Sequence, residues 1–413
     1  MSSKVFTPLA YLKGVTPGGL ALVDDGSGTV YAYVVDRGWP AETPSDPPEN
    51  EPIKTRGGKV VKVSIIGAAA SEVQDGDWPS TAIPDGEAAV ASQKPFYGPF
   101  IPPGSAPTHA YVCASAFRET APDVRDAADT ATGTIYRIEL ADGSLDGSTT
   151  DQLAGPFAIA FDATGHLYAT NARAGSGDAQ IVRITADLAT VTAVTLPSGV
   201  TIGEAGGVLW RDESGVGVLY VTDLADDPAA VRSDAALGAD KRGRVLRLVL
   251  NSSDPTTVDS GTEYAGDVDR PIAVQFGPAA DDTPDAVYVL CAFPQVRTEL
   301  LHEDPANASQ SCLPSWRDWK HPVGSIRRGD RPSPLTDAAT MDDFAPAIIG
   351  PGGLAILPGG TDPAELYVAT ASGAPTVPDS DGDDADTSAT VCADIAWTWR
   401  KPRSTMVYRV SLG

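Results

Sequence analysis

The chain has 413 residues, and its 55 acidic against 30 basic side chains give a formal net charge of −25 at pH 7. This sign argues against nucleic acid, whose phosphates are bound through Lys and Arg, and against an anionic membrane surface. Hydrophobic residues make up 42% of the chain, which excludes a disordered protein. No apolar run reaches the roughly 20 residues of a membrane helix, so we expect no membrane insertion.

The chain begins Met-Ser-Ser-Lys-Val-Phe-Thr-Pro, without the charged and then apolar regions of a secretion signal. We therefore expect a location in the cytoplasm or in a virus-like particle, whose proteins also lack such signals. The segment 4–13 is the first predicted strand, and it precedes a unit that recurs along the chain.

This unit has three predicted strands and occurs six times. Its first strand opens with Gly or Pro, as in Pro156-Phe157-Ala158-Ile159, and its third carries a basic residue, as in Ile181-Val182-Arg183-Ile184. Such short runs bounded by Gly, Asp and Pro predict strands, and no long helical period occurs. The second strands contain an apolar residue followed by Tyr, at Val30-Tyr31, Ala110-Tyr111, Leu167-Tyr168, Leu219-Tyr220, Val287-Tyr288 and Leu366-Tyr367.

Six such units predict an all-β, six-bladed β-propeller formed by residues 1–413 as one domain. A β-solenoid would need a shorter and stricter period. We expect the strand at 4–13 to complete the last blade, because closing the ring removes two exposed sheet edges. The expected spans from first to third strand are 17–66, 95–140, 155–188, 203–250, 270–330 and 350–413.

The segment from Gly155 to Asn171, Gly-Pro-Phe-Ala-Ile-Ala-Phe-Asp-Ala-Thr-Gly-His-Leu-Tyr-Ala-Thr-Asn, resembles the repeat of the NHL and SMP-30/strictosidine-synthase-like propellers. The resemblance implies architecture, because this short pattern is shared by unrelated functions. In the SMP-30-like lactonases a divalent ion is held by carboxylate and Asn ligands at the channel mouth. The matching positions here are Asn171, Glu204 and Asp223, although Glu204 lies in the fourth repeat and lacks the Pro of that motif.

The connections from second to third strand are long in five repeats, whereas those from first to second strand are short turns. Since strand connections alternate between the two faces of a blade, the long ones are expected on one face, where loops on a rigid scaffold carry function. The long connections are 37–56, 117–132, 226–242, 294–323 and 372–404.

Five of the seven Trp residues lie in these insertions together with a local basic cluster. Aromatic residues with Arg are typical of interface hot spots, and Trp also stacks on sugars, so we expect a recognition surface. The alternative is that the Trp residues only anchor long loops. The candidate residues are Trp39, His302, Trp316, Arg317, Trp319, Lys320, His321, Trp397, Trp399, Arg400 and Lys401.

The last insertion also contains alternating acids at Asp379, Asp381, Asp383 and Asp386. Several carboxylates around a Gly can wrap Ca²⁺, which takes 6–8 oxygen ligands. No Glu follows at the twelfth position, and a solvated acidic loop is the alternative. Ca²⁺ is the one cofactor for which the sequence suggests a dedicated segment.

Cysteine and histidine patterns give no catalytic set. Four Cys residues show no Cys-x-x-Cys spacing, and Cys113 and Cys291 are expected to be buried free thiols in second strands. Cys312 and Cys392 lie in adjacent insertions and would form a bridge in an oxidising compartment. No nucleophile elbow, His-Glu-x-x-His or P-loop is present, and His166 belongs to a turn on the face opposite the insertions.

The sequence therefore favours a non-catalytic recognition or scaffold propeller that binds a protein or glycan partner through its Trp-bearing insertion face. Both a cytoplasmic adaptor and a component of a larger particle, such as a phage tail, fit this description. The alternative function is a metal-dependent lactonase or esterase at the channel mouth, with Asn171, Glu204 and Asp223 as ligands.

Overall fold

The structure is a computed structural model of the whole chain, and it describes the following residues. They are 6–13, 17–24, 26, 29–36, 60–65, 71–72, 96–103, 107–114, 133–149, 153, 155–171, 180–203, 205–223, 243–268, 271–277, 286–291, 323–330, 332, 337–349, 351–356, 366–370 and 404–410.

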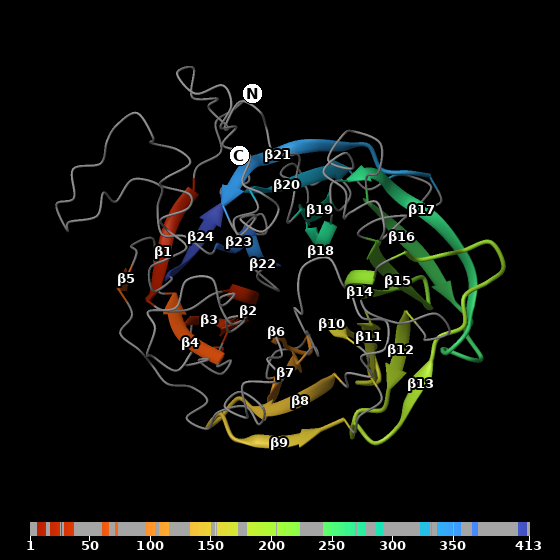
Figure 1. Cartoon of the computed structure of the whole chain (residues 1–413), viewed down its shortest axis with the longest axis horizontal. Coiled ribbons are helices and arrows are strands. Elements are labelled where there is room, and N and C mark those ends of the chain that lie inside the picture. Colours follow the sequence, from red (N-terminus) through yellow and green to blue (C-terminus); the bar gives the residue numbers. More distant parts are fainter. Residues whose placement is uncertain are drawn as a thin grey trace, which may run out of the picture.

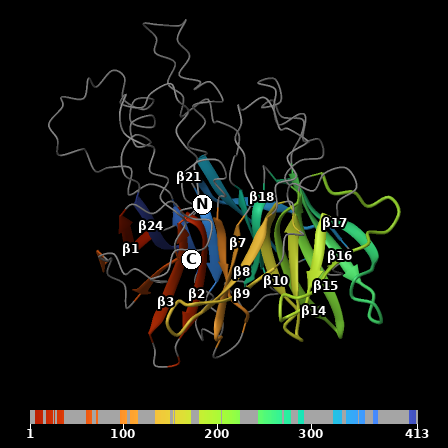
Figure 2. The ribbon, with the colours of Figure 1, turned by 60° about the horizontal axis from the view of Figure 1, so that its bottom comes forward.

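These residues form six sheets arranged in a ring, and no helix occurs among them (Figure 1). The first strand of each sheet faces the centre of the ring, and the later strands follow outward. Figure 2 shows the blades from the side, with strands running between the two faces of the disc. The predicted all-β, six-bladed propeller is confirmed. Within the described part of the chain, no helix is long and apolar enough to cross a membrane.

The strands of each blade follow one another in sequence. Blade 1 contains β2 (Pro17–Asp24), β3 (Val30–Asp36) and β4 (Val60–Ile65), and blade 2 contains β6 (Phe96–Phe100), β7 (His109–Ala114), β8 (Thr134–Glu139) and β9 (Leu145–Ser148). Blade 3 contains β10 (Pro156–Phe161), β11 (Leu167–Asn171), β12 (Ile181–Ile184) and β13 (Val191–Ala193).

The second half of the ring repeats this order. Blade 4 contains β14 (Ala205–Glu213), β15 (Val216–Asp223), β16 (Gly243–Leu250) and β17 (Val258–Val268). Blade 5 contains β18 (Pro271–Gly277), β19 (Ala286–Cys291), β20 (Val323–Asp330) and β21 (Met341–Ile349). Blade 6 contains β22 (Pro351–Ile356), β23 (Leu366–Thr370) and β24 (Ser404–Val410), followed by β1 (Phe6–Lys13) and β5 (Ser71–Glu72).

The N-terminal strand closes the ring, as the sequence predicts. β1 pairs antiparallel with β24, with Phe6 opposite Val410 and Lys13 opposite Ser404. The short strand β5 adds to the outer side of β1 in a parallel pairing. Closure of this kind covers the edge of β24, which would otherwise present unpaired backbone groups.

The hydrophobic core lies between neighbouring blades. In β15, Leu219 and Val221 pack towards blade 3, while Val218 and Tyr220 pack towards blade 5. Side chains alternate across a strand, so a second strand buried on both faces is apolar along most of its length, up to the residues at its end. Cys113 and Cys291 belong to such strands and are buried, as predicted. Burial raises the pKa of the Cys113 thiol well above its ordinary value.

A Tyr and a basic residue lie opposite each other across the second and third strands of every blade. The pairs are Tyr33–Lys62, Tyr111–Arg137, Tyr168–Arg183, Tyr220–Arg247, Tyr288–Arg328 and Tyr367–Arg409. In blade 1 the paired residue is Tyr33, whereas the expected Tyr31 lies opposite Ser64. Each Tyr is buried, and in blades 1 and 3 the basic side chain lies over the ring, with Lys62 Nζ 5.6 Å from the Tyr33 centroid and Arg183 Cζ 5.8 Å from the Tyr168 centroid. Burial raises the pKa of Tyr33 and of Tyr168 to about 12.

Glycines in the first strands allow neighbouring blades to meet closely around the centre. A Cβ on Gly353 in blade 6 would lie 2.4 Å from the backbone N of Leu20 in blade 1. A Cβ on Gly207 in blade 4 would lie 2.6 Å from the carbonyl O of Ile272 in blade 5. The Gly near the head of these first strands is therefore a packing requirement of the ring.

Candidate functional site

The six second strands end on one face of the disc, and we call the ring of their last residues the insertion rim. All six residues are buried, and each lies opposite the first residue of the neighbouring first strand. In every blade except blade 2 the register shifts directly after this pair. The insertion rim consists of Asp36, Ala114, Asn171, Asp223, Cys291 and Thr370. The long connections predicted to carry recognition start one to three residues after five of these residues.

Two residues of the rim stabilise their own blades through hydrogen bonds to side-chain oxygens. Asn171 Oδ1 accepts a hydrogen bond from the N–H of Gly155 at 2.6 Å, and Asp223 Oδ1 accepts one from the N–H of Gly203 at 3.1 Å. Each bond joins the end of a second strand to the segment that leads into the first strand of the same blade. The side-chain oxygens therefore help to fix the rim.

An ion pair adds to the anchoring in blade 4. Both Nε and Nη2 of Arg244 lie 3.2 Å from Asp223 Oδ2, and Nη2 also donates to the carbonyl O of Thr201 at 2.9 Å. The Asp223 side chain is 0% exposed, so its charge depends on this partner. Across the boundary between blades 3 and 4, Thr170 Oγ1 donates to the carbonyl O of Gly206 at 2.5 Å.

Most of the predicted site residues lie outside the described residues. This is the case for the recognition residues, the acidic segment, the third residue of the lactonase-like set and the proposed cysteine pair. They are Trp39, His302, Trp316, Arg317, Trp319, Lys320, His321, Trp397, Trp399, Arg400, Lys401, Asp379, Asp381, Asp383, Asp386, Glu204, Cys312 and Cys392. Asn171 and Asp223 lie at the same rim in neighbouring blades, and the metal site that would include them stays a prediction.

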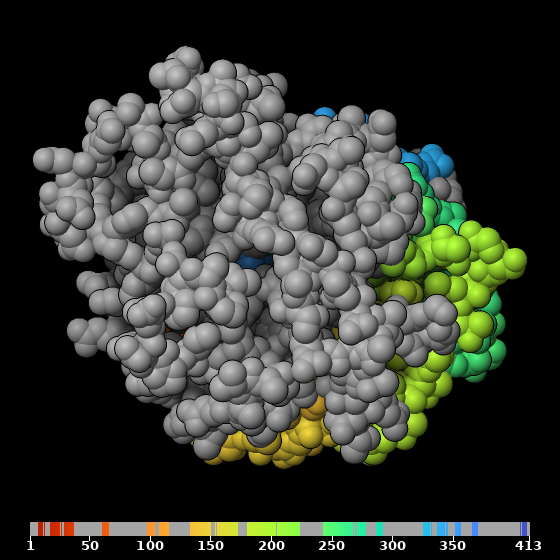
Figure 3. All heavy atoms as spheres, viewed as in Figure 1, coloured from red at the N-terminus to blue at the C-terminus, as the bar shows by residue number. Residues whose placement is uncertain are grey.

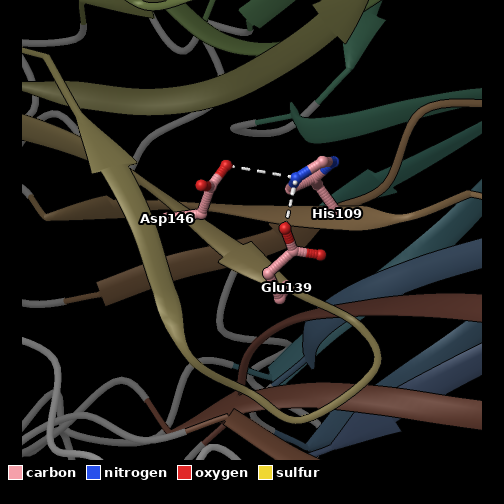
Figure 4. Close-up of side chains that lie close together, drawn as sticks. All are labelled: His109, Glu139 and Asp146. Atoms are coloured by element: carbon pink, nitrogen blue, oxygen red, sulfur yellow. Dashed lines mark hydrogen bonds and ion pairs between the residues drawn. The ribbon is translucent and has the colours of Figure 1, made fainter.

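A second group of polar side chains, which we call the blade-2 cluster, lies at the opposite face. It consists of His109 at the start of β7, Glu139 at the end of β8 and Asp146 in β9 (Figure 4). His109 Nε2 lies 3.1 Å from Glu139 Oε1 and 3.2 Å from Asp146 Oδ2. His109 and Glu139 are partly exposed and Asp146 is exposed, so the cluster is open to solvent.

Two further residues hold this cluster. Thr108 Oγ1 lies 2.7 Å from Nδ1 of His109, the ring nitrogen that does not face the acids. Arg137 Nε lies 2.6 Å from Asp146 Oδ2, and its Nη1 donates to the carbonyl O of Ala186 in the connection of blade 3 at 2.9 Å. The cluster is therefore supported on both sides by residues that are fixed in the scaffold.

Sequence patterns alone do not single out the blade-2 cluster. Its three residues come from three strands, and only the register that places His109 directly opposite Glu139 brings them together. The sequence holds one indication that the second repeat differs from the others. No Asp or Glu occurs from Phe96 to Thr108, where other repeats carry an acid near the first turn.

No family model matches the sequence, and no curated protein matches it either. Among solved structures, a mutant apocarotenoid oxygenase of Synechocystis has 13% sequence identity over 87% of this chain and 83% of its own, with a TM-score of 0.42. The RRP9 WD40 repeats have 9% identity over 98% of this chain and 100% of their own, with a TM-score of 0.41. The structure of U3-55K has 8% identity over 96% and 95%, also with a TM-score of 0.41. Likeness at this level carries no information about function.

Proposed function

We propose that this chain is a non-catalytic recognition propeller that binds a protein or glycan partner through the insertions attached to its rim. One observation supports this most: all six second strands end at the same face, and five of them continue into long connections there. A propeller fold is compatible with a scaffold for interactions, and the function of such a scaffold resides in its loops.

The rim suits this role because it is built to stay rigid. Its residues are buried, and Asn171, Asp223 and Thr170 hold the strand ends by hydrogen bonds to backbone groups. A fixed rim keeps the points at which the insertions are attached in constant positions, and rigid support of this kind favours binding. Within the insertions, Trp and Arg are the residue types that most often dominate interface energies.

The basic residues beside the Trp residues favour a partner with local negative charge. The chain as a whole carries −25, so a partner with a strongly acidic surface would be repelled elsewhere and attracted only at this patch. Such a partner could belong to the cytoplasm or to a larger assembly such as a phage tail.

The experiment compares two double variants with a control on another part of the disc. Trp316→Ala with Trp319→Ala, and Trp397→Ala with Trp399→Ala, each test one insertion. Leu145→Ser changes a side chain of β9 that is 43% exposed. We expect binding on a glycan array, or chemical cross-linking to a defined protein in native extract, to be lost in the double variants and retained in Leu145→Ser. Equal binding by all four proteins would contradict the proposal.

A lactonase would give a different result. Metal-dependent hydrolysis of simple lactones by the wild type, lost on Asn171→Ala while the Trp variants stay active, would replace the recognition proposal by an enzymatic one. The reason for testing the lactonase function is that Asn171 and Asp223 lie at the same rim.

A further inference from the structure

We propose that the blade-2 cluster binds a divalent transition metal ion such as Zn²⁺, with His109 Nε2, one oxygen of Glu139 and one oxygen of Asp146 as protein ligands. These atoms come from β7, β8 and β9, so the ion would join three strands of one blade (Figure 4). This site is separate from the insertion rim and does not depend on the recognition function.

The two distances from His109 are close to those between ligand atoms around a bound metal ion. Zn–N and Zn–O bonds of about 2.0–2.2 Å in a tetrahedral site place neighbouring ligand atoms about 3.4 Å apart. His109 Nε2 lies 3.1 and 3.2 Å from its two acidic neighbours, and all three ligand atoms lie within 4.8 Å of one another. The ligands would need only small movements, and solvent exposure leaves room for a water molecule as the fourth ligand.

A hydrogen bond alone satisfies this geometry less well. Nε2 of an imidazole carries at most one proton, and here it faces two carboxylate oxygens at nearly equal distances. One N–H shared between two oxygens makes a three-centre hydrogen bond, in which each contact is less linear and weaker than a single bond. A metal ion between the three atoms would serve both carboxylates together.

The surrounding residues are of the kind that support a metal ligand. A histidine bound to metal through one nitrogen usually donates its other N–H to an oxygen, and Thr108 Oγ1 lies 2.7 Å from Nδ1. Arg137 orients Asp146, and its positive charge will weaken the affinity for a cation. An imidazole ligand favours Zn²⁺, Ni²⁺ or Co²⁺ over Ca²⁺ and Mg²⁺, which prefer oxygen alone.

Blade 3 provides a matched comparison at the same face. His166 Nδ1 lies 3.8 Å from Asp162 Oδ1, and that oxygen already accepts hydrogen bonds from Thr164 and from the N–H of His166. The other oxygen of Asp162 pairs with Arg183 at 3.0 Å. His166 therefore has one acidic neighbour that is fully engaged, and the proposal does not extend to it.

The test is calorimetric titration of the whole protein with ZnCl₂, in the presence of excess Ca²⁺ to fill sites made only of oxygen. We expect a site of one Zn²⁺ per chain in the wild type and in the control His166→Asn. His109→Asn should weaken this site by more than the roughly 10–100-fold that loss of an outer-shell partner costs, and Thr108→Val by about that amount. Co²⁺ in place of Zn²⁺ should give a visible absorption band that His109→Asn removes.

Equal Zn²⁺ affinity in the wild type and His109→Asn would overturn the proposal, as would the absence of any one-to-one binding. Equal loss in His109→Asn and His166→Asn would also overturn it, because binding would then not depend on the cluster. Far-UV circular dichroism and the melting temperature without metal show whether each variant is folded, so loss of structure is not mistaken for loss of a ligand.

Discussion

Blades 3 and 4 place the acidic partner of their third-strand arginine differently from blade 2. In blade 3 the partner of Arg183 is Asp162, which directly follows β10, and in blade 4 the partner of Arg247 is Glu213, the last residue of β14. Blade 2 has no acid in that part of its sequence, and Asp146 from the outer strand β9 takes the position beside Arg137.

This difference shows how one copy of a repeat can acquire a site. The outer strands lie at the periphery of the disc, where those of blades 2 to 4 are seen in yellow to green in Figure 3. Asp146, which comes from such an outer strand, is solvent-exposed and lies beside His109, whereas the side chains of Asp162 and Glu213 are only 10% and 5% exposed beside their arginines. Blades 3 and 4 use the ion pair for stability, and blade 2 leaves it accessible to a ligand.

The largest effect is expected in blade 4. The Glu213 and Arg247 side chains are 5% and 12% exposed, and the hydroxyl of Tyr220 also donates to Glu213 at 2.5 Å. Glu213→Gln leaves a buried arginine without its countercharge, which should lower the free energy of unfolding by about 3–5 kcal/mol in urea denaturation. Asp146→Asn, the matched change in blade 2, should cost less than about 1 kcal/mol. Equal losses of stability in the two variants would contradict the distinction between the buried ion pair of blade 4 and the exposed one of blade 2.

A smaller effect is expected in blade 3, where Asp162→Asn should lower the free energy of unfolding by about 2 kcal/mol near neutral pH. Burial alone would raise the pKa of the Asp162 carboxyl, but hydrogen bonds from Thr164, Arg183 and the N–H of His166 outweigh it and lower the pKa. The stabilisation is therefore present above the ordinary Asp pKa of about 4 and is lost as pH falls through the lowered value. Urea denaturation at several pH values should show that the free energies of unfolding of the wild type and Asp162→Asn become equal in acid. A difference that does not change with pH would contradict this explanation.

The buried tyrosines are common to both kinds of blade and predict behaviour in alkali. Burial raises the pKa of Tyr33 and Tyr168 to about 12, whereas an unfolded tyrosine ionises near pH 10. Their contribution to stability is full below about pH 10 and is lost as pH rises through about 12. Tyrosinate absorbance at 295 nm should show a group of tyrosines that ionises above pH 11 or only with unfolding. Ionisation of every tyrosine near pH 10 in the folded protein would contradict it.

The smallest effect is expected for His109→Asn without metal. The side chain is partly exposed and its neighbours keep their other contacts, so the free energy of unfolding should change by no more than about 0.5 kcal/mol. Thermal denaturation in EDTA measures this. A large loss would mean that the cluster stabilises the fold, as the ion pairs of blades 3 and 4 do.

The architecture could be predicted from the sequence because its signals are local and repeated. Second strands buried on both faces have continuous apolar runs, as in Leu219–Val221, and the segment before the first repeat has the length and composition of one further strand, which closes the ring. The blade-2 cluster could not be predicted, because it depends on the register of β7, β8 and β9. Register also explains the difference in blade 1, where the sequence pattern predicts Tyr31 as the repeat tyrosine and the structure places Tyr33 opposite Lys62.

The most direct test of the difference between the blades is a nitrogen-15 NMR spectrum of histidine-labelled protein during addition of Zn²⁺. The chain has four His residues, so each imidazole can be assigned by single substitution. We predict that the His109 ring nitrogens shift at one equivalent of Zn²⁺ while those of His166 stay unchanged. An unchanged His109 signal, or an equal shift at both histidines, would contradict the claim that blade 2 departs from the repeat to form a metal site.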